Sequence, residues 1–213
     1  MKTLYIEDEV KYIGSQLAPH WIYKNYKIQG DAIVAFCGEC EVKLTEMVDI
    51  EDVINNEPIY SKYMLSFISE QFNIGLVEGV FRQRLLITCI KEALEALYTC
   101  TRPQNFLAGE GAVPQERNAI AGNAGEGICL VRSGDDLFIN NKKLSVSIAT
   151  KSLTSILIHT GVNILSDGAP IEVSGLESDL GIKDIKNFAL DVMKRYSEEI
   201  DDIIMASTKV RGV

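Results

Sequence analysis

Residues 143–148 alternate polar and apolar side chains, and together with the preceding Asn140-Asn141 this pattern predicts a β-hairpin with two different faces. The apolar positions on one face are Leu144, Val146 and Ile148. The positions between them are polar: Lys143, Ser145 and Ser147. Alternate side chains of a strand point to opposite faces. Asn140 and Asn141 tolerate the positive φ of a two-residue turn, which would pair Phe138 with Lys143 and Asp136 with Ser145.

A strand expected at residues 155–164 has the same two-faced character. Its apolar face carries Ile156, Ile158, Val162 and Ile164. We expect the polar sides of the hairpin and of this strand to form one sheet face: Asp136, Lys143, Ser145, Ser147, His159, Gly161 and Asn163. Gly161 would leave room for a ligand to approach the backbone. The alternative is an ordinary solvated face of an antiparallel sheet.

The remaining elements predict an α+β fold: a central, mainly antiparallel sheet flanked by helices, in one domain spanning residues 1–213. A buried strand is expected at residues 32–36 and helices at 49–55, 61–72, 76–98 and from Asp184 onward. In the helix at 76–98, apolar residues at four-residue steps predict a buried stripe: Val77, Phe81, Leu85, Cys89, Ala93 and Leu97. Residues 101–127 are rich in glycine and predict a flexible loop, with Arg117, Gly122 and Gly125 as candidate ligand contacts.

Charge, hydrophobic runs and cysteine spacing argue against nucleic acid, a membrane and zinc as partners of this chain. The formal net charge is −9, which disfavours nucleic acid as a ligand because phosphate binding needs clustered Lys and Arg. No run approaches the roughly 18 apolar residues of a membrane span, so no membrane partner and a cytoplasmic location are expected. Cys37 and Cys40 form a single C-x-x-C, for which free thiols are expected rather than zinc or redox chemistry.

Residues 135–145 (DDLFINNKKLS) and 159–164 (HTGVNI) resemble the core of biotin and lipoate protein ligases. The whole chain, including Gly14-Ser15-Gln16 and residues 143–150 (KLSVSIAT), resembles an uncharacterised prokaryotic family grouped with the biotin/lipoate ligase and class II aminoacyl-tRNA synthetase fold. The resemblance implies that Lys143 lies beside a substrate carboxylate and that Asp136 serves a nucleotide or its Mg²⁺. It also implies that Gly161 and Asn163 match the Gly-Ile-Asn segment of the biotin enzymes.

Two functions from different classes follow. The first is an enzyme that binds a small carboxylic acid and activates it with ATP and Mg²⁺, with Lys143 stabilising the developing charge and an acceptor protein as partner. The second is a binding or regulatory module without chemistry, which the lack of the basic glycine-rich loops of those ligases favours. A scaffold whose polar face meets another subunit, for example in a homodimer, is a third class.

Overall fold

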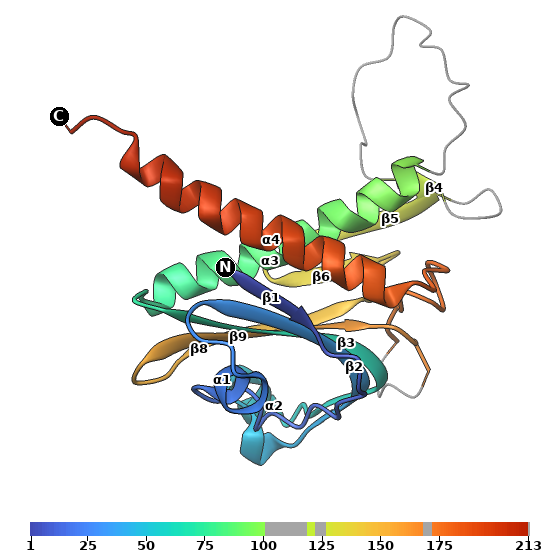
Figure 1. The fold of residues 1–213 in the computed structure, drawn as a ribbon. Coiled ribbons are helices and arrows are strands. Elements are labelled where there is room, and N and C mark those ends of the chain that lie inside the picture. The colour runs from blue at the N-terminus through green and yellow to red at the C-terminus, as the bar shows by residue number, and fades with distance from the viewer. Residues whose placement is uncertain (101–118, 122–126, 168–171, 213) are drawn as a thin grey trace, which may run out of the picture.

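The computed structural model describes residues 1–100, 119–121, 127–167 and 172–212. A five-stranded sheet divides the fold into two sides (Figure 1). In spatial order its strands are β1 (Lys2–Tyr5), β2 (Ala32–Val42), β3 (Ile59–Phe72), β9 (Ser155–Asn163) and β8 (Ser145–Lys151). Only β1 and β2 pair in parallel among these strands, and the other three neighbouring pairs are antiparallel. The expected α+β fold with a mainly antiparallel sheet is confirmed.

The central strand β3 replaces the helix that the sequence predicted at residues 61–72, and that prediction was wrong. Met64 and Ile68 lie in the apolar cluster on one side of the sheet, whereas Leu65 and Phe67 lie in the cluster on the other side. Because both faces of β3 are buried, apolar residues occur on both alternations of the strand. Read together along the sequence, the apolar positions of both faces have a spacing like that of an amphipathic helix, although the positions of each face alone repeat every second residue, as in a strand.

A smaller antiparallel sheet stands beside the first. It contains β4 (Ala119–Ala121), β5 (Gly127–Ser133), β6 (Asp136–Ile139) and β7 (Lys142–Lys143). Asn140 and Asn141 have φ values of 49° and 67°, so the two-residue turn between β6 and β7 is confirmed. The chain then leaves this sheet at Leu144, whose N–H donates to the Leu137 carbonyl, and enters the large sheet as β8.

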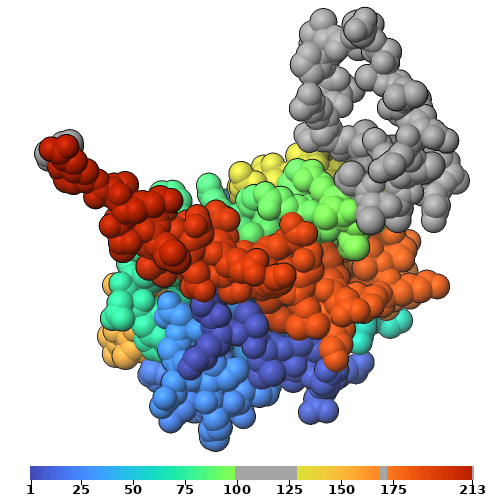
Figure 2. Space-filling model, turned by 45° about the horizontal axis from the view of Figure 1, so that its top comes forward, coloured from blue at the N-terminus to red at the C-terminus, as the bar shows by residue number. Residues whose placement is uncertain are grey.

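Two long helices cover one side of the large sheet: α3 (Leu76–Cys100) and α4 (Ile185–Thr208). Figure 2 shows α4 lying across the surface of this side with part of α3 beside it. The Asp184 side chain caps α4 by accepting from the Asn187 N–H, as its sequence suggested. Among the described residues, no helix combines the length and the apolarity that a membrane crossing requires.

The predicted stripe on α3 is only partly correct. Cys89 and Ala93 are buried, but Val77 and Phe81 are 71% and 68% exposed. A four-residue step turns a helix by 400°, so successive members of the stripe drift by about 40° around the axis. The middle of the stripe therefore faces the sheet, while its first members have rotated into solvent.

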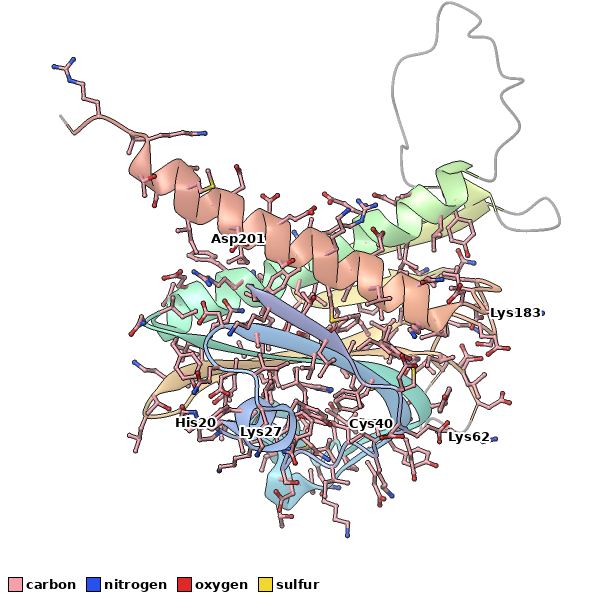
Figure 3. All side chains as sticks on the ribbon, in the orientation of Figure 1. His20, Lys27, Cys40, Lys62, Lys183 and Asp201 are labelled. Carbon is pink, nitrogen blue, oxygen red and sulfur yellow. The ribbon has the colours of Figure 1, made fainter. Side chains whose placement is uncertain are left out.

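The other side of the large sheet is covered by short elements and loops. These are α1 (Trp21–Tyr26), the 3-10 turn η1 (Leu44–Glu46) and α2 (Ile50–Asn55). Figure 3 shows His20 and Lys27, which flank α1, on this side, and Asp201 of α4 on the opposite side. Ile22 and Phe36 belong to the apolar cluster that these elements form with the sheet.

Gly38 lets the chain cross closely over β2. A Cβ built on Gly38 would lie 2.3 Å from the Val10 backbone oxygen, and the pairing of β2 with β3 shifts between Gly38 and Cys40. Cys37 and Cys40 flank this irregularity, and each is a buried free thiol in a different apolar cluster. Neither thiol forms a disulfide, and the expectation that they have no zinc or redox role stays a prediction.

We expect Gly38→Ala to lower the free energy of unfolding by about 1–3 kcal/mol, because the added methyl group has to displace the backbone at Val10. Urea unfolding followed by circular dichroism measures this loss. Gly212→Ala is the control, since a Cβ at Gly212 meets nothing within 4 Å, and it should leave the midpoint unchanged. An unchanged midpoint for Gly38→Ala would contradict the close approach.

Candidate functional site

A cavity of about 350 Å³ lies on the side of the large sheet that α1 and α2 cover. Its floor is the face of the sheet that carries Met64, Val146 and Ile148. Its walls come from the segment around Tyr12, from residues 42–60 and from the β6–β7 hairpin. This volume suits a small organic molecule, and an apolar floor with a few polar groups is typical of ligand sites.

Lys143 and Asp136 form an ion pair at one end of the cavity. The tight turn pairs Phe138 with Lys143, and this register brings the side chains of β6 and β7 together. Lys143 Nζ lies 3.0 Å from Asp136 Oδ2, and the two side chains are 33% and 27% exposed. The hairpin thus holds one cation and one acid in contact with the cavity.

The pKa of the Asp136 carboxyl is raised above its usual range. Burial is the main cause, and the charge of Asp135 adds to it, while the hydrogen bond and charge of Lys143 act in the opposite direction. The ammonium therefore compensates only part of the cost of placing this carboxylate at the cavity.

Asn163 brings a second polar group to the same end. Its N–H donates to the carbonyl of Leu144 at 3.0 Å, which places Asn163 beside the residue that follows Lys143. The Asn163 side chain lines the cavity and the residue is only 6% exposed. Within the described part of the chain, no residue hydrogen-bonds to its carboxamide, so the amide is available to a ligand.

His159 and Tyr12 line the cavity as a stacked pair. Their ring centroids are 3.7 Å apart with an interplanar angle of 11°. His159 Nε2 shares a hydrogen bond with the hydroxyl of Ser66 at 3.3 Å, and burial lowers the pKa of the imidazole to about 3. His159 is therefore neutral near pH 7 and offers polar but uncharged contacts.

Ser145 and Ser147 do not share the face of His159 and Asn163, and that prediction was wrong. Ser145 Oγ accepts from the Leu137 N–H at 2.9 Å, away from the cavity. Ser147 Oγ lies 2.8 Å from Thr160 Oγ1 and accepts from Gln83 of α3, so its hydroxyl faces the helices even though the residue lines the cavity. The chain changes sheets at Leu144, and the alternation that begins at Lys143 does not continue through this break.

Position 161 is a glycine because of packing within the protein, and not because a ligand approaches it as predicted. A Cβ on Gly161 would lie 2.2 Å from Met64 Sδ, so the side chain of Met64 fills the space above this glycine. Gly161 does not line the cavity. It therefore accommodates the packing of the cavity floor instead of the close approach of a ligand.

The sequence pattern missed two groups at the cavity. Tyr12 belongs to an irregular segment with no periodicity that would assign it to a face. The second group is a set of carboxylates from residues 46–57: Glu46, Asp49, Glu51, Asp52 and Glu57. A cluster of acidic residues in the sequence was available as a signal, but nothing local placed that cluster beside Lys143.

ATP and Mg²⁺ do not fit the described residues of the cavity. Lys143 is the one cationic side chain among the described lining residues, against seven carboxylates including Asp136. Within the described ranges, no three His, Cys, Asp or Glu side chains come together as a metal site built from protein ligands alone would require. The loop candidates Arg117, Gly122 and Gly125 lie outside the described residues. No reaction step through ATP is derived from this arrangement.

Comparison with known proteins places the chain in a family. The model of the domain of unknown function DUF366 matches residues 1–105 and 119–211. The chain belongs to the DUF366 family. A solved structure, a protein of unknown function from Pyrococcus horikoshi, is 34% identical, with a TM-score of 0.80 over 100% of this chain and 99% of that one.

Two more distant structures identify the fold. Biotin protein ligase from Aquifex aeolicus, in complex with biotin and ATP, is 14% identical, with a TM-score of 0.54 over 94% of this chain and 70% of that one. Protein Ta0514 from T. acidophilum, with bound lipoic acid, is 12% identical, with a TM-score of 0.54 over 94% of this chain and 86% of that one. The DUF366 chain thus has the fold of biotin and lipoate protein ligases, as the resemblance implied.

We expect Lys143→Met to raise the pKa of Asp136 further, because the substitution removes the charge that partly offsets burial. Carboxyl carbon chemical shifts followed by NMR across a pH titration measure this change. Lys142→Met is the matched control, since Lys142 lies 3.9 Å from the exposed Glu172 and is not paired with Asp136. Equal pKa values for Asp136 in both variants would contradict the ion pair.

We expect the protein to lose stability on acidification through His159. In the unfolded chain this imidazole takes up a proton near pH 6.5, whereas the folded state resists protonation down to about pH 3. The contribution of His159 to the free energy of unfolding therefore falls as the pH drops below 6.5, by about 1 kcal/mol per pH unit. Urea unfolding at several pH values between 7 and 5 should show a shallower loss for His159→Phe, which keeps a ring against Tyr12. An identical pH dependence in both proteins would contradict a neutral buried imidazole.

Proposed function

We propose that this DUF366 protein binds a small organic acid, with the ligand carboxylate at Lys143 and its apolar body along the cavity floor. The observation that carries the proposal is that the Lys143 ammonium and the amide of Asn163, which has no partner among the described residues, line the same apolar-floored cavity. Both groups donate hydrogen bonds, and donors of this kind bind a carboxylate.

Asp136 positions the ammonium in this arrangement. A lysine ammonium has three N–H donors, and the ion pair with Asp136 at 3.0 Å uses one of them. The other two are available to a ligand without breaking the pair. The carboxylate of Asp136 thus holds Lys143 at the cavity, while the ligand shares the same cation.

The shape and lining of the cavity agree with an acid that has an aliphatic part. Met64, Val146 and Ile148 supply apolar surface next to the polar end. Distant relatives in fold carry ligands of this chemistry, since biotin and lipoic acid are both carboxylic acids with a hydrocarbon chain. This likeness in fold supports the class of ligand and does not identify the acid.

Binding without activation is the function we favour over an ATP-dependent ligase. The described cavity residues place one ammonium among seven carboxylates, and a nucleotide triphosphate would add several negative charges to them. ATP-dependent activation is the second candidate, because a biotin protein ligase with the same fold has been solved with ATP.

Isothermal titration with hexanoate tests the proposal. We expect wild-type protein and Lys142→Met to bind this acid equally, and Lys143→Met to bind it about tenfold more weakly, since a charged hydrogen bond is lost. Equal affinity in Lys143→Met would overturn the assignment of the carboxylate to this lysine.

Adding ATP and Mg²⁺ to the same titration separates the two candidates. A binding module gives the same affinity for hexanoate with and without nucleotide and releases no pyrophosphate. Acid-dependent release of pyrophosphate, measured with a coupled phosphate assay, would instead establish activation and reject the purely binding function.

A further inference from the structure

The cavity carries an excess of negative charge that the described residues do not neutralise. The carboxylates around its opening are Glu46, Asp49, Glu51, Asp52 and Glu57. None of the five forms an ion pair with a described residue. The Lys143 ammonium, the one described cation of the lining, is already paired with Asp136. A simple organic acid would add one more negative charge to this set.

The electrostatics of Asp52 shows that these carboxylates and Lys143 act on the same part of the cavity. Burial raises the pKa of the Asp52 carboxyl, the charge of Asp49 raises it further, and the charge of Lys143 acts in the opposite direction. Asp49 also caps α2, because its side chain accepts from the Glu51 N–H at 2.9 Å. The cap therefore keeps Asp49 near Asp52, although the charge of Asp49 disfavours the charge of Asp52.

Two buried polar side chains indicate, independently of the acidic residues, that a ligand fills this space. The residue Asn163 is 6% exposed, and its carboxamide hydrogen-bonds to no other described residue. The Tyr12 residue is 3% exposed, and its hydroxyl has no hydrogen-bond partner in the described part of the chain. Buried polar groups are normally paired, and every described polar side-chain atom that is fully shielded has a partner. These two groups therefore face the cavity with hydrogen bonds still to be made.

We infer that the ligand carries a protonated amine as well as a carboxylate, with the carboxylate at Lys143 and Asn163 and the amine among the carboxylates of Asp49, Asp52 and Glu57. This inference rests on the proposed function, and it narrows the ligand from any small acid to the class of amino acids in the broad sense. The amine would supply the charge that the described protein residues lack, and several unpaired carboxylates that line one cavity stabilise a cation between them even though no three of them meet at one point.

A metal ion is the other cation that carboxylates commonly hold, and the described residues argue against it. In the ranges with described side chains, no three acidic, His or Cys groups lie close enough together to ligate one ion. The carboxylates instead surround the opening at separate positions on η1, on α2 and before β3. An amine at the end of an organic chain can meet them there without a preformed coordination shell.

Three probes of matched length test the inference by isothermal titration near pH 7 and at low salt: hexanoate, 6-aminohexanoate and hexylamine. We expect 6-aminohexanoate to bind about tenfold more tightly than hexanoate, which corresponds to one charged pair. In Asp52→Asn this advantage should shrink severalfold, whereas Asp8→Asn, an exposed acid outside the cavity, should keep it in full.

The outcomes of this titration separate the inference from the proposed function. Hexanoate that binds as tightly as 6-aminohexanoate overturns the inference and leaves the binding of an acid intact. Tight binding of hexylamine without binding of either acid supports the amine contact and overturns the carboxylate site at Lys143. Absence of heat from all three probes at millimolar concentrations overturns both.

A measurement without any ligand keeps the test independent of the choice of probe. If the carboxylates repel one another in the empty cavity, Asp52→Asn should raise the midpoint of thermal unfolding by about 1–2 °C. Asp8→Asn serves again as the control and should leave the midpoint unchanged. A midpoint for Asp52→Asn at or below the wild-type value would overturn the charge excess on which the inference depends.

Discussion

The burial of β3 on both faces is the constraint on which the rest of the structure depends. Side chains at Leu65 and Phe67 complete the core beneath α3 and α4, while Met64 and Ile68 pack on the side that holds the cavity. The polar residues at the end of the strand follow the same division. Gln71 bonds to Arg82 and to Tyr196 on the helix side, whereas Glu70 accepts the N–H of His20 on the other side. One strand thus joins the helix layer to the thinner layer that contains the cavity.

The part of the site that is local in sequence could be predicted, and the part that depends on long-range packing could not. Asn140 and Asn141 determine a turn, the turn determines the register, and the register alone brings Lys143 to Asp136. The faces of Ser145 and Ser147 depend instead on the transfer of the chain between two sheets at Leu144, which no periodicity records. The strand β3 was mistaken for a helix for a related reason: both of its faces are buried, so apolar residues occur at odd and even positions and hide the two-residue period of a strand.

The charge of the cavity distinguishes this DUF366 protein from what its fold alone suggests. The hairpin with Lys143 supports the capture of an acid, whereas the opposite wall adds carboxylates that a purely anionic ligand would have to face. The pKa values of both Asp52 and Asp136 are raised, mainly by burial and further by neighbouring carboxylates, although the charge of Lys143 acts against both shifts. Neutral His159 and Tyr12 contribute surface and hydrogen-bonding capacity but no charge, and in the inferred complex the amine of the ligand supplies the positive charge.

The separation of the two apolar clusters by the sheet has an evolutionary consequence. Most of the buried side chains that hold α3 and α4 lie in a cluster that shares no residue with the one beside the cavity. Substitutions at a cavity position such as Val146 can therefore reshape the cavity while the packing beneath α3 and α4 stays unchanged. A scaffold divided in this way allows recognition to diverge among descendants while the architecture persists.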